Sequence, residues 1–441
     1  MKKLLIGLAL FSCLTSFSQS PQITYEEYDL KNGLHVILHE DHSTPIVGVS
    51  VMYHVGSKNE DPKRTGFAHF FEHLLFEGTE NIKRGEFFKY IENAGGKNNA
   101  NTSKDRTFYY EILPSNQLEL GLWLESERML HAVIDQEGID TQREVVKEEK
   151  RLRVDNRPYG TWMSEIAKRA YSTHPYKWQP IGSMDHLNAA KKEEFIQFYK
   201  TYYVPNNAVL SIAGDFDSKE LKKQIQSYFG TIPKGKNKIP KVTTVEAPLK
   251  GEIRDTIYDN IQLPGLMQAY RIPEQGTKDF YALEMLSKLL SKGESSRLNK
   301  KCVQDSEKAM YIYSFPYGTE DPGLLMLISV VNGDTKLEDL EAEIEAEYRK
   351  IKTALITDVE LQKLKNAIES DYIYNFNSVM GIAENLANYH MYFGDANLIN
   401  TELERYLSVT KEDIKRVANK YLVKENRVVL YYLPKEKEDE K

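Results

Sequence analysis

Hydrophobic and polar residues alternate along the first part of the chain. In LHVILHE, residues 34–40, apolar side chains recur at every second position as Leu34, Val36 and Leu38. The run IVGVSVMYHVGS, which begins at residue 46, is almost continuously apolar, and a His-Ser-Thr-Pro turn separates the two. A period of two and a short apolar run both predict β-strands. We therefore expect two strands in this region.

Three histidines, His35, His39 and His42, lie close together in the same region. Histidine clusters can bind metal ions. Side chains at alternating positions of a half-exposed strand produce the same pattern without any metal. We favour the second interpretation.

The next pattern is GFAHFFEHLLFEG, residues 66–78, an apolar run that contains His69, Glu72 and His73. In a helix these three side chains share one face. Residues four apart can offer two imidazole ligands to one zinc ion, and Glu72 is placed to take a proton from a water that the ion activates. H-x-x-E-H is the motif order of the inverzincins. The alternative is a pair of core histidines beside an ion-paired glutamate.

Further elements follow the motif. We expect a polar helix around residues 84–94, a Gly95-Gly96 break, a strand ending at Pro114 and a helix over residues 116–134. Another helix is expected over residues 141–153, with Thr141 as its cap. A tetrahedral zinc needs a third protein ligand, and this acidic helix offers Glu144, Glu148 and Glu149. Spacing alone does not choose between them.

The chain also repeats itself. KEEFIQFYKTYYVPNNAVL, residues 192–210, recurs as KEDIKRVANKYLVKENRVVL from residue 411. FAHFFEHLLF, residues 67–76, lies over YALEMLSKLL, residues 281–290, where the motif positions become Leu283, Leu286 and Ser287. The sequence therefore predicts a duplication in which one half keeps the polar motif and the other keeps only the packing.

The repeat suggests the domain boundaries. We expect an N-terminal catalytic domain over 19–235, a Lys- and Pro-rich linker over 236–248 and a homologous domain without metal over 249–435. Residues 436–441 form a charged tail. The predicted fold class is α+β, two homologous domains that each have an antiparallel-rich sheet with helices packed on one face.

Residues 1–18 show the pattern of a secretory signal peptide: Lys2 and Lys3, an apolar stretch from Leu4 to Leu14, and small residues before Gln19. This predicts an exported, periplasmic protein. Cys13 lies within this stretch, and lipid anchoring at Cys13 is the alternative to simple cleavage. Without the signal peptide only Cys302 remains, so no internal disulfide is expected.

Composition narrows the function. The 441-residue chain is 41% hydrophobic and has a net charge of −7, with no basic stripe, which argues against nucleic acid as a partner. No other run approaches the about 20 apolar residues that a membrane-spanning helix needs. We therefore expect no transmembrane segment in the mature chain.

Several ordered segments resemble the pitrilysin/insulinase family of zinc metallopeptidases: GFAHFFEHLLFEGT, NANTSKDRTFYYEI, EVVKEEKR, HPYKWQPIGSMDHL and FYKTYYVPNNAVLSIAGDFD. The resemblance covers nearly all of the chain after residue 18, in the short two-repeat form of mitochondrial processing peptidase and its bacterial relatives. It implies a zinc endopeptidase with one Zn²⁺ per chain, and Glu72 as its catalytic base.

The resemblance also implies particular residues. The family's third ligand corresponds to Glu149, with Glu148 in reserve. The family's substrate-binding edge strand maps to Asn99 and Ala100, where a peptide can pair as an added strand. Without the family, NNAN would be interpreted as a turn before a strand.

This chain departs from the family in two places. Gln142 stands where relatives carry an acidic residue, which alters any role in orienting the metal ligands. An Arg and a Tyr that bind substrate in relatives correspond to Val303 and Met310, with Tyr311 one residue away. We therefore expect a homologous subunit without metal to supply the Arg and Tyr in a heterodimer, or else a homodimer.

Two other functions compete with a peptidase. A non-catalytic assembly subunit could keep the fold and a structural zinc, although such a role does not require Glu72. A metal-dependent hydrolase of another substrate is disfavoured because the sequence contains no Gly-rich phosphate loop.

Overall fold

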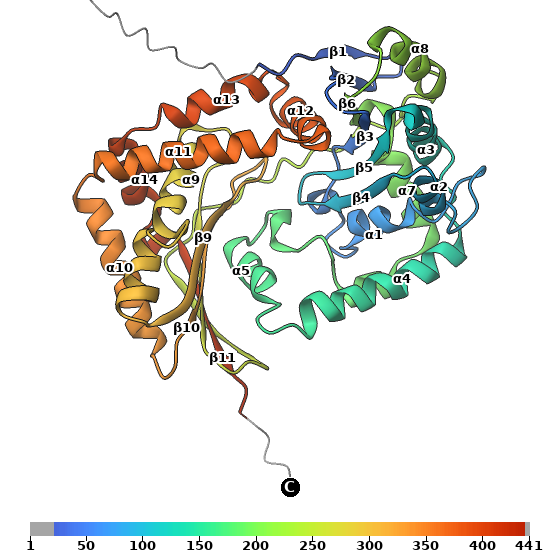
Figure 1. Ribbon diagram of the computed structural model, residues 1–441. Helices are drawn as coiled ribbons and strands as arrows, with labels where there is room; N and C mark the ends of the chain where they lie inside the picture. The colour runs from blue at the N-terminus through green and yellow to red at the C-terminus, as the bar shows by residue number, and fades with distance from the viewer. Residues whose placement is uncertain (1–21, 437–441) are drawn as a thin grey trace, which may run out of the picture.

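The computed structural model describes residues 22–436. The predicted signal peptide, Cys13 and residues 437–441 of the predicted tail lie outside them. The described chain forms two halves that face each other, with the N-terminal half in blue to green and the C-terminal half in yellow to red (Figure 1). None of the helices in residues 22–436 is both long and apolar enough to cross a bilayer.

The N-terminal half is built on a six-stranded sheet in the order β1-β2-β6-β3-β5-β4. Its strands are β1 (Glu26–Asp29), β2 (His35–Glu40), β3 (Ile46–Tyr53), β4 (Lys97–Thr102), β5 (Thr107–Pro114) and β6 (Ala208–Gly214). Neighbouring strands are antiparallel except β2 and β6. The two strands expected from the alternation, β2 and β3, are both present, and they lie on either side of β6.

The C-terminal half is built on a five-stranded sheet in the order β7-β11-β8-β10-β9. Its strands are β7 (Ile253–Asp259), β8 (Gly265–Arg271), β9 (Ala309–Tyr317), β10 (Leu324–Val331) and β11 (Arg427–Pro434). Only the β7–β11 pair is parallel. The order matches that of the first sheet without β1, so β9 is the counterpart of the edge strand β4.

Helices surround both sheets. In the first half they are α1 (Phe67–Leu74), α2 (Phe87–Asn93), α3 (Leu118–Leu130), α4 (Gln136–Lys150), α5 (Trp162–Ala170), α6 (Met184–Ala189), α7 (Lys192–Tyr202) and α8 (Ser218–Phe229). In the second half they are α9 (Lys278–Ser291), α10 (Leu337–Thr353), α11 (Asp358–Asn375), α12 (Val379–Phe393), α13 (Leu398–Leu407) and α14 (Lys411–Tyr421). The repeated segments at 192 and 411 become α7–β6 and α14–β11, which agrees with a duplication.

The helices predicted around 84–94 and over 116–134 are present but shorter, and the helix predicted over 141–153 differs most at its start. The helix expected to begin at Thr141 begins at Gln136, and Asp135 is its cap because its carboxylate accepts a hydrogen bond from the Gly138 amide at 2.7 Å. Thr141 lies inside this helix, α4, so its assignment as the cap was wrong. Asp is as good a cap as Thr, and the first turn carries too few apolar residues to mark a helix by period.

Each sheet has helices of its own half on one face, as predicted, but its other face is covered by a helix from the opposite half. Strand residues such as Val36 point into the core with α1, α3, α7 and α8, whereas the next residue, Ile37, points toward α12. In the same way Met267 of the second sheet packs against α5. The two halves therefore share their cores, and the predicted α+β class with two homologous domains is confirmed in this interlocked form.

The segment between the halves carries no helix or strand from residue 230 to residue 252. It is nevertheless attached to both halves. The carboxylate of Glu246 accepts hydrogen bonds from the backbone amides of Ser172, Thr173 and His174 and forms an ion pair with Arg271 at 3.3 Å. The linker over 236–248 stays a prediction. The contacts of Glu246 attach the segment close to the end of that range.

Candidate metal centre

The motif helix α1 begins with a glycine and a buried glutamate. Gly66 has φ +102°, a left-handed conformation that favours glycine. The two carboxylate oxygens of Glu60 accept hydrogen bonds from the Gly66 and Ala68 amides, both at 2.9 Å. Phe67, Phe70 and other apolar side chains of the helix are buried. Glu60 thus provides acceptors for two amides at the start of α1 that have none within the helix.

His69 and His73 lie on the face of α1 that meets α4, and Glu149 of α4 completes the group. His73 Nε2 lies 3.2 Å from Glu149 Oε2, and His69 Nε2 lies 3.5 Å from the same oxygen. The two imidazole rings are 4.9 Å apart and nearly perpendicular, at 75°. The ligand atoms of all three residues lie within 4.8 Å of one another.

These residues fit a zinc ion. Ligand atoms at about 2.0–2.2 Å from a tetrahedral zinc are about 3.3–3.6 Å apart, close to the two separations above. Glu149 Oε2, the oxygen that faces both imidazoles, is buried and has no hydrogen-bond partner within the described residues. Burial, together with the charge of His73, lowers the pKa of His69 to about 4, so this imidazole is neutral at pH 7, as a ligand must be.

Of the three glutamates that the sequence left open, the structure brings only Glu149 to the histidines. Glu144 forms an ion pair with Lys147 at 2.9 Å, and Glu148 forms one with Arg151 at 3.0 Å, both on the exposed side of α4. The contact with His73, 3.2 Å away, lowers the pKa of Glu149 even though burial opposes this. Glu149 is therefore the carboxylate positioned to bind a metal.

Glu72, between the two histidines, is held by a residue from another element. Thr102 Oγ1, at the end of β4, donates a hydrogen bond to Glu72 Oε2 at 2.7 Å. Burial raises the pKa of Glu72, and the hydrogen bond from Thr102 acts in the opposite direction. A carboxylate with a raised pKa next to a ligand cluster suits a general base near neutral pH.

Two residues of this site were missed in the sequence. Arg153 Nη1 lies 2.8 Å from Glu149 Oε1, the oxygen that faces away from the histidines. Its position, four residues after Glu149 on a helix, is a signal that could have found it. Thr102 carries no such signal, because it is thirty residues from Glu72 and the two meet only through the packing of α1 against β4.

Gln142, where the resemblance implies an acidic residue, contacts Glu77. Its side-chain amide donates a hydrogen bond to Glu77 Oε1, and Glu77 also pairs with Arg84 at 2.9 Å. Gln142 Oε1 is buried and has no partner within the described residues. The amide thus joins a small polar network after α1, and the structure shows no contact between Gln142 and the three candidate ligands.

Asn99 and Ala100 lie in β4, the outermost strand of the first sheet, so NNAN forms an edge strand rather than a turn. They pair with Tyr110 and Tyr109 of β5 on one side. The Ala100 amide donates a hydrogen bond to the Asn99 side chain at 2.9 Å. That contact would have to open before the amide could bind a peptide.

The positions that correspond to the family's Arg and Tyr lie in the second half. Val303 packs against the core of that half, and Met310 on β9 is 56% exposed. Their neighbour Tyr311 lines the same cavity as His69 and Glu149. Leu283, Leu286 and Ser287 of α9 are buried, as expected for a half that keeps only the packing.

The histidines of β2 were expected to be strand residues, and His35 and His39 are. However, His35 Nε2 lies 3.3 Å from Glu27 and its ring stacks on His390 of α12 at 3.4 Å and 11°. Imidazole lone pairs lie in the plane of the ring, so two parallel rings at this distance cannot aim at one ion. This second cluster is better described as a pair of histidines held by carboxylates.

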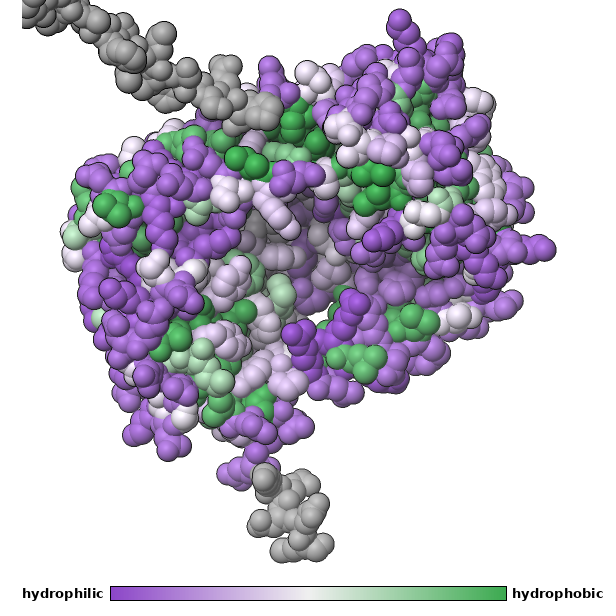
Figure 2. Space-filling view, viewed as in Figure 1, coloured by the Kyte–Doolittle hydropathy of each residue, from purple (hydrophilic) through white to green (hydrophobic). Residues whose placement is uncertain are grey.

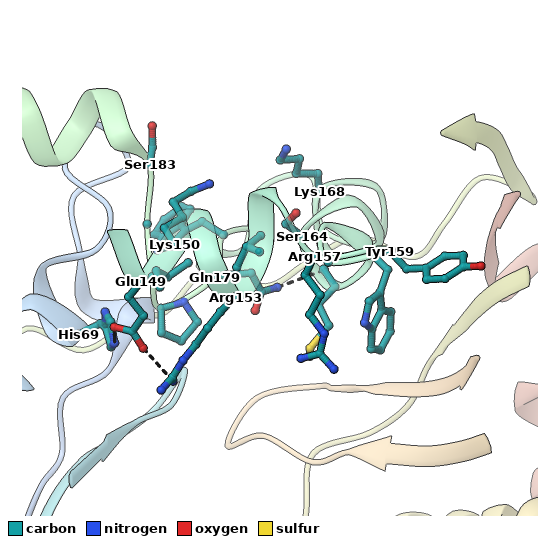
Figure 3. A pocket seen from close by; sticks show the side chains of 18 of the residues that line it. His69, Glu149, Lys150, Arg153, Arg157, Tyr159, Ser164, Lys168, Gln179 and Ser183 are labelled. Atoms are coloured by element: carbon teal, nitrogen blue, oxygen red, sulfur yellow. Dashed lines mark hydrogen bonds and ion pairs between the residues drawn. The ribbon is translucent and has the colours of Figure 1, made fainter. Parts of the chain in front are cut away.

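The candidate metal centre opens into a cavity of about 930 Å³ between the halves. The space-filling view shows that the face toward the viewer is hollowed between the halves (Figure 2). His69 and Glu149 lie at one end of the close-up in Figure 3. HPYKWQPIGSMDHL supplies part of the wall through Trp178, Gln179, Ser183 and their neighbours. An extended peptide thus has room to reach the candidate ligands.

Comparison with known proteins agrees with this arrangement. The family model of Insulinase (Peptidase family M16) matches residues 35–179, and that of the Peptidase M16 inactive domain matches residues 189–368. A zinc protease of Helicobacter pylori, PqqE, is 32% identical over 439 residues, 98% of this chain and 99% of the relative. A probable mitochondrial-processing peptidase subunit beta of Arabidopsis thaliana is 24% identical over 403 residues, 89% and 75% of the two chains.

Solved structures show the same fold. The crystal structure of a protease from Helicobacter pylori superposes with a TM-score of 0.89 at 32% identity, covering 93% of this chain and 100% of that one. Similarity at this level extends over both sheets and the helices exchanged between them. The chain therefore belongs to the insulinase family, peptidase family M16.

Proposed function

We propose that this protein is a zinc-dependent endopeptidase that hydrolyses peptides or unfolded polypeptide segments. The observation that carries the proposal is the convergence of His69, His73 and Glu149 around one point, with Glu72 beside them. The zinc protease named among its relatives supports the choice of metal. One Zn²⁺ per chain would be held by these three residues.

The role of each residue follows from its position. When bound, the zinc would supply Lewis acidity for a water and for the scissile carbonyl. Glu72 takes a proton from the attacking water and returns it to the leaving amine. Thr102 keeps the Glu72 carboxylate in place, and Arg153 does the same for Glu149. Asn99 and Ala100, on the edge strand β4, would pair with the extended peptide.

We further propose that a homologous subunit without metal completes the active site. Val303 and Met310 cannot make the contacts of an Arg and a Tyr, and one relative is named as the beta subunit of a processing peptidase. A homodimer is the alternative, in which Tyr311 of this chain, already in the cavity, serves instead.

We propose that the mature protein is exported to the periplasm, on the pattern of residues 1–18. Cell fractionation with an antibody against the protein tests this. Release of the protein with the periplasmic contents supports cleavage of a signal peptide, and recovery with membranes supports lipid anchoring at Cys13.

The second candidate is a non-catalytic assembly subunit, favoured by the match of residues 189–368 to a family domain described as inactive. The intact group around Glu72 favours the peptidase, because a structural zinc site has no use for a free carboxylate beside its ligands.

The deciding experiment is cleavage of an unstructured quenched fluorescent peptide by the purified mature chain with zinc, alone and with the homologous subunit. Glu72→Gln should abolish cleavage while zinc content and fold remain. Glu148→Gln is the matched control, since Glu148 is an exposed neighbour of Glu149. Activity that requires the homologue supports the split site. Activity of the chain alone overturns the obligate heterodimer, and no activity in either case supports the assembly subunit.

A further inference from the structure

The cavity beside the candidate metal centre extends well beyond the ligands. Besides His69 and Glu149 it is lined by Met267, Tyr311 and Ile328, which come from β8, β9 and β10 of the second sheet. In Figure 3, Glu149 and Tyr159 lie toward opposite ends of the group of lining side chains. A peptide bound at the metal centre would therefore place residues away from the cleaved bond in this space.

The lining of the cavity is strongly basic. Its charged side chains are one carboxylate, Glu149, and five cations: Lys150, Arg153, Arg157, Lys168 and Lys177. The whole chain has a net charge of −7, so this accumulation is opposite to the balance of the protein. A cleft lined by charges of one sign concentrates ligands of the other sign.

Most of these cations already have partners. Lys150 pairs with Asp155 at 2.5 Å, Lys168 with Glu165 at 2.8 Å, and Arg153 with Glu149. Within residues 22–436, Arg157 forms no ion pair, and it is exposed to the cavity. Its guanidinium is therefore available to bind a carboxylate, which it can do through two parallel hydrogen bonds.

The backbone that carries Arg157 is irregular. After α4 the chain continues as a π-helical segment, Arg151–Asp155, and Tyr159 adopts φ +59°, which is strained for a residue with a side chain. Tyr159 is held there from the second half, because its amide donates to Asp259 Oδ2 at 2.8 Å and its hydroxyl to the Leu263 carbonyl at 2.6 Å. Arg153 and Arg157 project from this segment toward the same side (Figure 3).

Apolar and aromatic side chains line the same cavity as Arg157. Trp162, Met163 and Met267 form part of the wall. Tyr311 faces it from β9, and the positive charge of Arg157 opposes the rise that burial causes in the pKa of Tyr311. These side chains would contact the apolar parts of a bound peptide, while the guanidinium of Arg157 stays free to bind a charged group.

We propose that this cavity is a specificity pocket for an acidic side chain of the substrate, in which Arg157 binds the carboxylate. The inference rests on the proposed peptidase function and names its substrate class: peptides that carry Asp or Glu near the cleaved bond, with apolar neighbours for the aromatic wall.

The test separates binding from cleavage. Two peptides of equal length, labelled with fluorescein and amidated at the C-terminus, carry either Glu or Gln at alternate positions and are otherwise identical. Fluorescence anisotropy measures their binding to the full mature Glu72→Gln protein. The Glu peptide should bind about tenfold more tightly, the usual size of one charge-assisted hydrogen-bond pair. Arg157→Glu should remove this preference, and Arg157→Gln should reduce it.

Arg349→Glu is the control. Arg349 is exposed on α10 and does not line the cavity, and its substitution changes the net charge by the same amount as Arg157→Glu. Equal binding of the two peptides, or loss of the preference in Arg349→Glu as well, would overturn the proposal. If the protein with Glu72 intact binds the Glu peptide preferentially but cleaves neither peptide, the peptidase function fails while the pocket's specificity stands.

Discussion

Thr102 Oγ1 donates a hydrogen bond to Glu72 Oε2 at 2.7 Å, which links the edge strand of the first sheet to the carboxylate of the motif helix. The contact stabilises the ionised form of Glu72 in a position where burial disfavours it. It also means that the strand proposed to bind the peptide and the proposed base are held together. A substitution at Thr102 should therefore change the pH dependence of a reaction in which Glu72 acts as the base.

Thr102→Val should raise the pKa of Glu72 further, because the hydrogen bond that lowers it is lost. Glu72 must be ionised to accept a proton, so the acidic limb of the kcat/KM profile should move to higher pH, by about one unit for about 1.4 kcal/mol of lost hydrogen bonding. Thr102→Ser keeps the hydroxyl and should leave the profile in place. An unchanged limb in Thr102→Val would exclude this role.

Glu149→Gln and Glu148→Gln should differ in zinc content. Removing the Glu149 carboxylate leaves two imidazoles as ligands, so the affinity for zinc should fall by about a hundredfold or more. Substitution of the exposed Glu148 should leave the affinity for zinc unchanged. Metal analysis after dialysis against a weak chelator measures this. Equal zinc loss in both variants would show that the third ligand has been misassigned.

The contact between Lys58 and Glu320 should make stability depend on acid pH. Lys58 Nζ lies 2.5 Å from Glu320, which belongs to the β9–β10 connection and also contacts His54 at 2.9 Å. Burial opposes ionisation of Glu320, but the hydrogen bond and charge of His54 and the charge of Lys58 outweigh it and lower its pKa to about 2.

Because this pKa is depressed in the folded state, the stabilisation is complete above the unfolded value of about 4.5 and disappears as the pH falls toward about 2. Glu320→Gln should lower the free energy of unfolding by about 1–3 kcal/mol at pH 7, and the difference from wild type should vanish near pH 2. Thermal melts across this range measure it. A constant difference at all pH values would indicate that charge is not involved.

Leu386→Ala should destabilise the N-terminal half although it lies in the C-terminal half. Leu386 of α12 is fully buried against the first sheet, and such a truncation costs about 2–5 kcal/mol. Hydrogen exchange should increase in β2 and β6. Leu340→Ala, equally buried in the core of the second half, should instead increase exchange in the second sheet. The reverse pattern would contradict the exchange of helices between halves.

The sequence by itself determined the parts of this protein that repeat at short range. The period of the apolar residues identified β2, β3 and α1, and four-residue spacing placed His69 and His73 on one face. The internal repeat identified the duplication, which the two sheets then show in their strand orders. The strands, the helix and the histidine spacing depend on local geometry, and the duplication depends only on comparing the chain with itself. All of them can therefore be predicted from the order of residues alone.

Only the tertiary structure decided which elements meet. Spacing left Glu144, Glu148 and Glu149 open, and the choice depends on the face that α4 turns toward α1. Nothing local in residues 379–393 indicates that α12 covers the sheet of the other half. Likewise, nothing in the sequence around Thr102 indicates that its hydroxyl contacts Glu72. An apolar helix face requires a partner but does not specify one, because that choice comes from the packing of the whole chain.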